Sequence, residues 1–158
     1  MISLVGVEKG KAFKKKSARL IQRQCMFVPH VALIPVGKRF KLVNEDKLLH
    51  NLRTLSKENV ALNIAHPKFK KTLRIKKKFK KPEIMRIKCD IHSWMDGWII
   101  AIAHPYYVVS KKSGRFTLKN VPPGAYKLRA WHEILGEQVQ TVTVPAGGEV
   151  KADFTFKK

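Results

Sequence analysis

Short apolar stretches separated by frequent turn-forming residues run along the whole chain. Residues 98–103 are apolar almost throughout, as expected of a strand that is buried on both faces. Residues 56–65 could form a short helix or an irregular crossover, and no 12-residue stretch has the period of an amphipathic helix. In the first two thirds of the chain, the predicted strands are residues 31–34, 40–43, 72–79, 84–88 and 98–103. The pattern therefore predicts an all-β fold.

After residue 104 the alternation of strands and turns becomes regular. Gly and Pro clusters at 122–124 and 145–148 supply the backbone angles that tight turns require. Strands are expected at residues 106–110, 116–118, 126–132, 138–144 and 150–156. This part is predicted to be a small antiparallel sheet. We therefore predict two domains, residues 1–103 and residues 104–158.

Charge distinguishes the composition more than any other property. The 158 residues include 33 Lys and Arg but 11 Asp and Glu, which gives a formal net charge of +22. Such a surface attracts polyanions, so nonspecific polyanion binding is expected at low salt. In the lysine-rich stretch 68–88, apolar Leu73, Ile75 and Phe79 recur at even spacing, which places the lysines on the solvent face of a strand. No nucleic-acid-binding motif accompanies them, so no specific nucleic-acid recognition is expected.

Several other classes of function are also disfavoured. No apolar run approaches 18 residues, so no membrane span is expected. The apolar residues 1–7 come before the first cluster of lysines rather than after it, so no signal peptide is expected in this chain. The chain has no Gly-x-Ser-x-Gly motif and no phosphate-binding glycine loop. We therefore do not expect an enzyme.

The stretch that carries chemistry is Cys89-x2-His92-x2-Met95, in a predicted loop between two strands. A thiolate and imidazoles with a distant thioether are the ligands of a blue copper site. The second imidazole must come from elsewhere, and His50, which follows the strand at 40–43, is the natural candidate. His30 is an alternative ligand that could replace His50. The expected cofactor is one copper ion in a type 1 site.

The two cysteines, Cys25 and Cys89, admit a different interpretation. In an exported protein an even pair of cysteines often forms a disulfide. A bridged Cys89 sulfur could not bind copper as a thiolate, so this disulfide would replace the metal site.

These residues resemble the bacterial plastocyanin-like or methylamine-utilisation-like cupredoxins with an amicyanin-like copper loop, which continue into a carboxypeptidase-regulatory-like half. The matching stretches are residues 27–31, 49–51, 88–95, 104–107, 114–116, 121–126 and 130–132. The resemblance implies a cupredoxin-like Greek-key β-sandwich followed by a small transthyretin-like β-domain. It also implies an electron-transfer or copper-binding role, a periplasmic or cell-surface location, and electron exit through His92.

The predicted function is that of a type 1 copper protein acting as a one-electron carrier. The basic surface would steer an acidic redox protein, a cytochrome or a dehydrogenase, toward it. Two alternatives from another class are a copper-binding module without a redox role and a sandwich that binds a polyanion or a partner protein.

Overall fold

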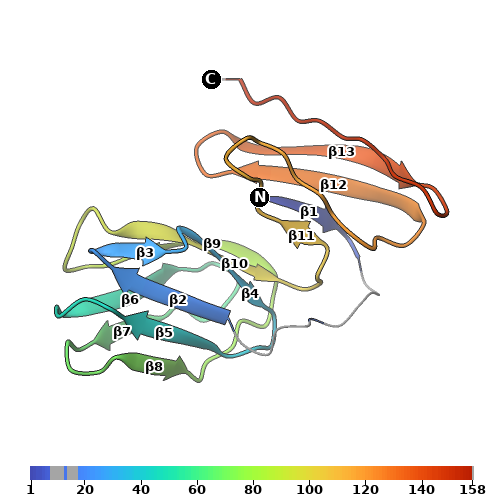
Figure 1. The fold of residues 1–158 in the computed structure, drawn as a ribbon. Coiled ribbons are helices and arrows are strands. Elements are labelled where there is room, and N and C mark those ends of the chain that lie inside the picture. Colours follow the sequence, from blue (N-terminus) through green and yellow to red (C-terminus); the bar gives the residue numbers. More distant parts are fainter. Residues whose placement is uncertain (8–12, 14–17, 158) are drawn as a thin grey trace. The chain divides into compact units, whose positions relative to one another are not determined.

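The computed structural model describes residues 1–7, 13 and 18–157. Within these residues every regular element is a β-strand, which confirms the all-β class, and no helix there could span a membrane. The strands are β1 (Ile2–Val5), β2 (Ala18–Arg23), β3 (Met26–Val28), β4 (Val31–Pro35), β5 (Phe40–Asn44), β6 (His50–Leu55), β7 (Asn63–His66), β8 (Thr72–Ile75), β9 (Glu83–Lys88), β10 (Asp96–Ile102), β11 (Tyr107–Val108), β12 (Gly124–His132) and β13 (Gly136–Val144). They divide between two compact units (Figure 1).

Unit 2, Phe13–Ala103, is a sandwich of two mixed sheets. One sheet has the order β4-β10-β9-β6-β7 and the other the order β3-β2-β5-β8. Each contains one parallel pair, β4 with β10 and β2 with β5, while the remaining neighbours are antiparallel. Parallel neighbours cannot be joined by a hairpin, so the chain crosses between the sheets, and loops distant in sequence meet at the ends of the sandwich.

Apolar side chains from both sheets of unit 2 form one core. In β5, Phe40 and Leu42 alternate with the less buried Lys41 and face Leu52 of β6 and Ile87 of β9 within the same cluster. This period of two is the one that the sequence predicted for residues 40–43. Alternating apolar residues of the strands therefore form the core, and the loops at the ends of the sandwich can carry polar side chains.

Unit 1 combines both ends of the chain, Met1–Ala12 and His104–Lys158. Its sheet has the order β11-β1-β12-β13, and all pairs are antiparallel, as the sequence predicted for the second half. The predicted domain of residues 1–103 differs from this arrangement, because β1 pairs with β12 along four residues. The terminal amino group of Met1 also donates to the carbonyl of Trp131 at 2.7 Å. The sequence of a short apolar strand does not indicate which strand it pairs with, so the sheet to which residues 2–5 belong could not be predicted.

Some predicted strands are shorter or missing. The strand predicted at 72–79 ends at Ile75, although Phe79 remains buried and stacks on Phe40 with 6.0 Å between ring centroids. Residues 116–118 and 150–156 form no strand, yet Phe116 and Phe154 pack on the core of unit 1. Apolar alternation reports which side chains are buried, and burial does not require ladder hydrogen bonds. Residues 56–65 contain no helix; residues 56–62 form an irregular crossover, and residues 63–65 belong to β7.

That crossover is held by one carboxylate, Glu83 at the start of β9. It accepts hydrogen bonds from the backbone N–H groups of residues 57, 58 and 59, from the hydroxyl of Ser56 and from the side-chain amide of Asn59. Burial alone would raise the pKa of Glu83, but these hydrogen bonds outweigh it and lower the pKa to about 2. The ionised form of Glu83 therefore stabilises the fold.

Glu83→Gln is expected to remove part of the acid sensitivity of unit 2. Because the pKa is lowered in the folded state, the stabilisation is complete above the unfolded value of 4.5 and is lost as the pH falls toward about 2. The shift sets an upper limit of about 3 kcal/mol, and solvent screening reduces it to about 1–2 kcal/mol. Urea unfolding between about pH 5 and pH 2 measures this difference between the wild type and the variant.

Glu58→Gln is the matched control, since the Glu58 carboxylate forms an exposed ion pair with Lys81. Its curve of unfolding free energy against pH is expected to run parallel to that of the wild type. If the curve for Glu83→Gln also ran parallel to that of the wild type, the lowered pKa assigned to Glu83 would be contradicted.

Candidate metal centre

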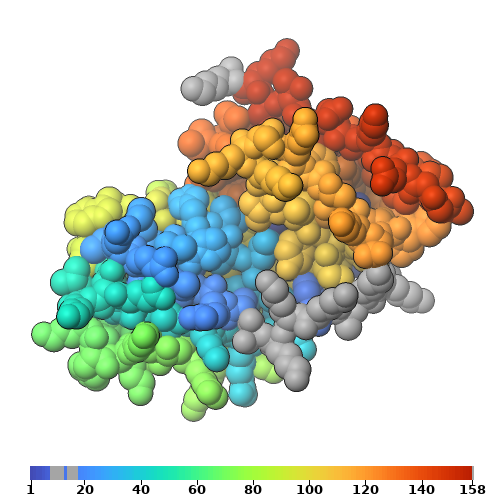
Figure 2. Space-filling view, viewed as in Figure 1, coloured from blue at the N-terminus to red at the C-terminus, as the bar shows by residue number. Residues whose placement is uncertain are grey.

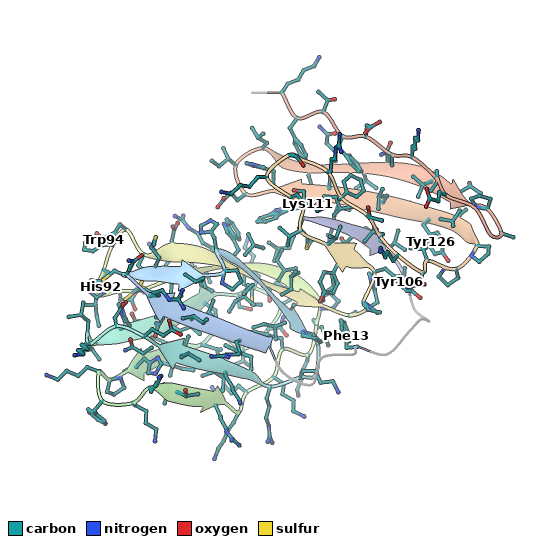
Figure 3. The ribbon with its side chains drawn as sticks, viewed as in Figure 1. Phe13, His92, Trp94, Tyr106, Lys111 and Tyr126 are labelled. Carbon is teal, nitrogen blue, oxygen red and sulfur yellow. The ribbon has the colours of Figure 1, made fainter. Side chains whose placement is uncertain are left out.

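Three connections meet at one end of unit 2. They are the two-residue turn between β2 and β3, the loop 45–49 between β5 and β6, and the loop 89–95 between β9 and β10. Figure 3 shows His92 and Trp94 at this end, close to the β2–β3 connection. In Figure 2 the segment around residue 25, in blue, and the segment around residue 90, in yellow-green, both reach the surface there.

The loop 89–95 is closed by its own backbone. The N–H of Cys89 donates to the carbonyl of Met95 at 2.9 Å, and the N–H of Met95 donates to the carbonyl of His92 at 2.9 Å. The loop is also clamped to β6, because Asn51 accepts from the N–H of Asp90 at 2.6 Å and donates to its carboxylate at 2.9 Å. These bonds hold Cys89 against the strand that begins with His50.

The structure brings together Cys89, His50 and His92, three of the four residues that the sequence offered as ligands. The Sγ atom of Cys89 lies 3.6 Å from Nδ1 of His92 and 4.0 Å from Nδ1 of His50. A metal about 2.3 Å from a thiolate and about 2.0 Å from an imidazole, at angles of about 110–120°, separates these donor atoms by about 3.5–3.8 Å. The 3.6 Å separation lies within this range and the 4.0 Å separation is about 0.2 Å above it, so a slight closing of the three side chains would accommodate a single metal ion.

The donors differ in their exposure to solvent. His50 is fully buried at 0%, and Cys89 and Met95 are each 1% exposed. His92 is half-buried, and its ring meets that of Trp94 edge to face, with 5.4 Å between centroids. His50 is the first residue of β6 rather than a loop residue, so the strand fixes its backbone. The site is thus enclosed except at His92.

Asp46 sets the orientation of the His50 ring. Its Oδ2 lies 2.9 Å from Nε2 of His50, and a carboxylate only accepts hydrogen bonds, so Nε2 carries a hydrogen and, in the neutral ring, Nδ1 presents its lone pair. Metal-binding histidines commonly donate their other ring N–H to a carboxylate in this way. The loop around Asp46 is shaped by Asn44, which accepts from the N–H of Asp46 at 3.0 Å and donates to the carbonyl of Leu48 at 2.9 Å.

Asp46 also holds the β2–β3 turn, which places a second thiol at the site. The carboxylate accepts from the N–H of Gln24 at 2.7 Å and of Cys25 at 3.0 Å. Burial of Asp46 would raise its pKa, but these two hydrogen bonds and the contact with His50 lower it below the ordinary value. Donor atoms of Cys25, His50 and His92 lie within 4.8 Å of one another. The sequence offered Cys25 as a candidate disulfide partner of Cys89 rather than as a ligand, because no motif links residue 25 to the loop 89–95.

The other sequence predictions about the site concern His30 and a disulfide. His30 is exposed and does not join the ligand cluster found among the described residues. Cys25 and Cys89 are both free thiols in the structure. Burial, followed by electrostatic repulsion from the neighbouring Asp46 and Cys89 groups, raises the pKa of the Cys25 thiol.

Hydrogen bonds between buried polar residues connect the two sheets next to the candidate site. Gln22 of β2 donates to the carbonyl of Asn51 at 3.2 Å, and its side-chain oxygen lies 2.7 Å from Nδ1 of His66. His66 is directly opposite His50 in the β6–β7 pair, and burial lowers its pKa. Because Gln22 belongs to one sheet and Asn51 to the other, these bonds link the two layers next to the candidate metal-binding side chains.

Asp46→Ala is expected to weaken metal binding by about 10–100-fold, since the His50 ring loses the partner that orients it. The loss of three hydrogen bonds to a charged group is also expected to lower the free energy of unfolding by about 1–3 kcal/mol. Competition for copper with a chromophoric chelator, together with urea unfolding, measures both effects.

Glu45→Ala serves as its control, because the neighbouring Glu45 carboxylate pairs with the exposed side chain of Arg23. This variant is expected to bind copper like the wild type. Equal weakening in the two variants would contradict a specific role for Asp46.

The carboxypeptidase-regulatory-like part of the sequence resemblance is confirmed by comparison with family models. Residues 99–157 match the carboxypeptidase regulatory-like domain. A search of curated proteins finds no match to the chain.

Solved structures similar to the chain include cupredoxins. An oxidised amicyanin mutant is 14% identical, with a TM-score of 0.47, covering 63% of this chain and 90% of that one. A purple cupredoxin from Nitrosopumilus maritimus is 17% identical, with a TM-score of 0.44, covering 54% of this chain and 99% of that one. The copper-containing nitrite reductase from Thermus scotoductus is 26% identical, with a TM-score of 0.45, covering 63% of this chain and 25% of that one. The chain is thus similar to cupredoxins in structure and, over residues 99–157, to carboxypeptidase regulatory-like domains.

Proposed function

We propose that the chain binds one copper ion in a type 1 site and carries single electrons. His50, Cys89, His92 and Met95 would hold the ion. The observation that carries this proposal is the placement of the Cys89 thiol between the Nδ1 atoms of two histidines, at 3.6 and 4.0 Å, in a buried position.

The donor set favours copper over the other common metals. A soft thiolate with two imidazoles and a thioether suits copper, whereas hard ions such as magnesium and calcium prefer oxygen ligands. The carboxylate that contacts His50, Asp46, is also engaged by two backbone N–H groups. When bound, copper supplies a one-electron couple between its two oxidation states.

The role of the protein would be to keep its ligands fixed while the charge of the centre changes. Asp46 holds His50, and the Asn51–Asp90 clamp holds the loop that carries Cys89. The burial of His50, Cys89 and Met95 excludes water from the centre. Ligands that do not move upon oxidation or reduction allow rapid electron transfer, so this rigidity supports the carrier function.

His92 would be the point at which electrons enter and leave. Among the proposed ligand side chains it is the one that is half-buried rather than buried, and the adjacent Trp94 is 67% exposed. A formal charge of +22 would draw an acidic redox protein to the surface of the chain. Salt would weaken that association, since charges are screened over about 8 Å at physiological ionic strength.

The test begins with the reduced, metal-free chain and copper(II). An intense visible absorption band from thiolate to copper and a reversible one-electron couple in voltammetry are the expected results. If the copper-loaded chain shows the absorption band but no reversible one-electron couple, the electron-carrier function is contradicted. The chain would then be a copper-binding module without a redox role. A chain with two reactive thiols and no band would contradict the type 1 site.

A further inference from the structure

Cys25 is a thiol that the four-ligand site does not use. It lies in the two-residue turn between β2 and β3, where it is half-buried. Its sulfur shares a cluster with donor atoms of His50 and His92, all within 4.8 Å of one another. The sulfur of Cys89 lies within 4.0 Å of the same two histidines. The two imidazoles are therefore approached by two separate thiols.

The position of Cys25 is not explained by packing or by turn preference. The side chain belongs to neither hydrophobic cluster of the fold. Gln24 and Cys25 have φ angles of 53° and 52°, in the left-handed region where turns of this kind favour Gly, Asn or Asp. Asp46 stabilises this backbone by accepting from both N–H groups. The same carboxylate that orients His50 therefore holds the thiol of Cys25 beside it.

The spacing requires a small adjustment for direct coordination. A sulfur and a nitrogen atom bound to one metal ion are separated by about 3.5–3.8 Å. The donor atoms of Cys25, His50 and His92 lie within 4.8 Å of one another, so the longest of these separations must shorten by about 1 Å for all three to bind one ion. Cys25 lies in a short connection that is exposed on one side, where Gln24 and Met26 are both exposed. Movement of a surface turn by this amount does not disturb the core.

We propose that Cys25 is a further ligand of the metal centre, binding copper(I) together with His50 and His92. This inference rests on the copper site proposed above and extends it. Upon binding, the Cys25 thiol gives its proton to solvent and forms a sulfur–copper bond, with no change in oxidation state. Soft thiolate ligands favour copper(I) over copper(II). Cys25 thus adds affinity for the reduced ion at the exposed side of the site.

The first measurement is competition for copper(I) with a chromophoric chelator under anaerobic conditions. Cys25→Ser and Cys25→Asn both remove the thiol, but Asn suits the left-handed backbone of the turn whereas Ser does not. Both are expected to bind copper(I) about tenfold more weakly than the wild type, a change of about 1.4 kcal/mol. Gln24→Ser alters the same turn without removing a thiol and is expected to bind like the wild type. Affinity restored in Cys25→Asn alone would assign the effect to the turn and overturn the proposal.

The second measurement is alkylation of Cys25 in Cys89→Ser, followed by mass spectrometry. In this variant Cys25, His50 and His92 are the remaining clustered donors, so copper(I) is expected to slow the alkylation of Cys25. Equal rates with and without copper(I) would overturn the proposal, as would a Cys25–Cys89 disulfide in copper-loaded wild type. Failure of the type 1 site would be seen separately, as a missing copper(II) absorption band in the wild type.

Discussion

Cys89→Ser is expected to abolish the visible absorption band of the copper(II)-loaded protein. The band requires a thiolate bonded to copper, and a serine hydroxyl cannot replace it. Cys89 is 1% exposed and lies 3.6 Å from Nδ1 of His92 and 4.0 Å from Nδ1 of His50. The measurement is an absorption spectrum of the wild type and the variant, each loaded with copper(II) at equal concentration.

Cys25→Ser provides the control for this experiment, since it removes the other thiol of the chain. This variant is expected to keep the copper(II) band, because its Cys89, His50, His92 and Met95 are unchanged. A band that survives in Cys89→Ser and disappears in Cys25→Ser would assign the copper(II) thiolate to the β2–β3 turn. That result would contradict the ligand set proposed for the oxidised site.

Phe40→Ala is expected to lower the free energy of unfolding of unit 2 by about 3–5 kcal/mol. The Phe40 side chain is 1% exposed and stacks on Phe79, with 6.0 Å between ring centroids. Its removal leaves a cavity between the two sheets that the surrounding strands cannot fill. The measurement is urea unfolding with hydrogen exchange of the β5 and β6 amides, which reports on unit 2 separately from unit 1.

Phe69→Ala is the matched control, because the Phe69 side chain is 84% exposed. A surface substitution of this kind is expected to change the free energy of unfolding by about 0.5 kcal/mol or less. Comparable losses in Phe40→Ala and Phe69→Ala would show that the sandwich core does not limit the stability of unit 2.

The sequence by itself was sufficient for the features that depend on neighbouring residues. Strand alternation predicted the all-β class and the strands around Val31 and Phe40, since burial of one sheet face follows a period of two. The closeness of Cys89 and His92 was predictable because a single short loop carries both side chains, and the same loop carries Met95. Backbone hydrogen bonds within that loop, from Cys89 to Met95 and from Met95 to His92, close it locally.

Tertiary structure decided what depends on pairing between distant segments. The parallel pairing of β2 with β5 brings the turn at Cys25 beside Asp46, so one carboxylate holds both that turn and His50. Neither Cys25 nor Asp46 carries a local signal of this contact. Likewise, β1 joins β12 across more than a hundred residues, although its four residues, three of them apolar, would suit many sheets. Local sequence sets which faces are apolar, but the choice of partner strand is made by the free energy of the whole packed core.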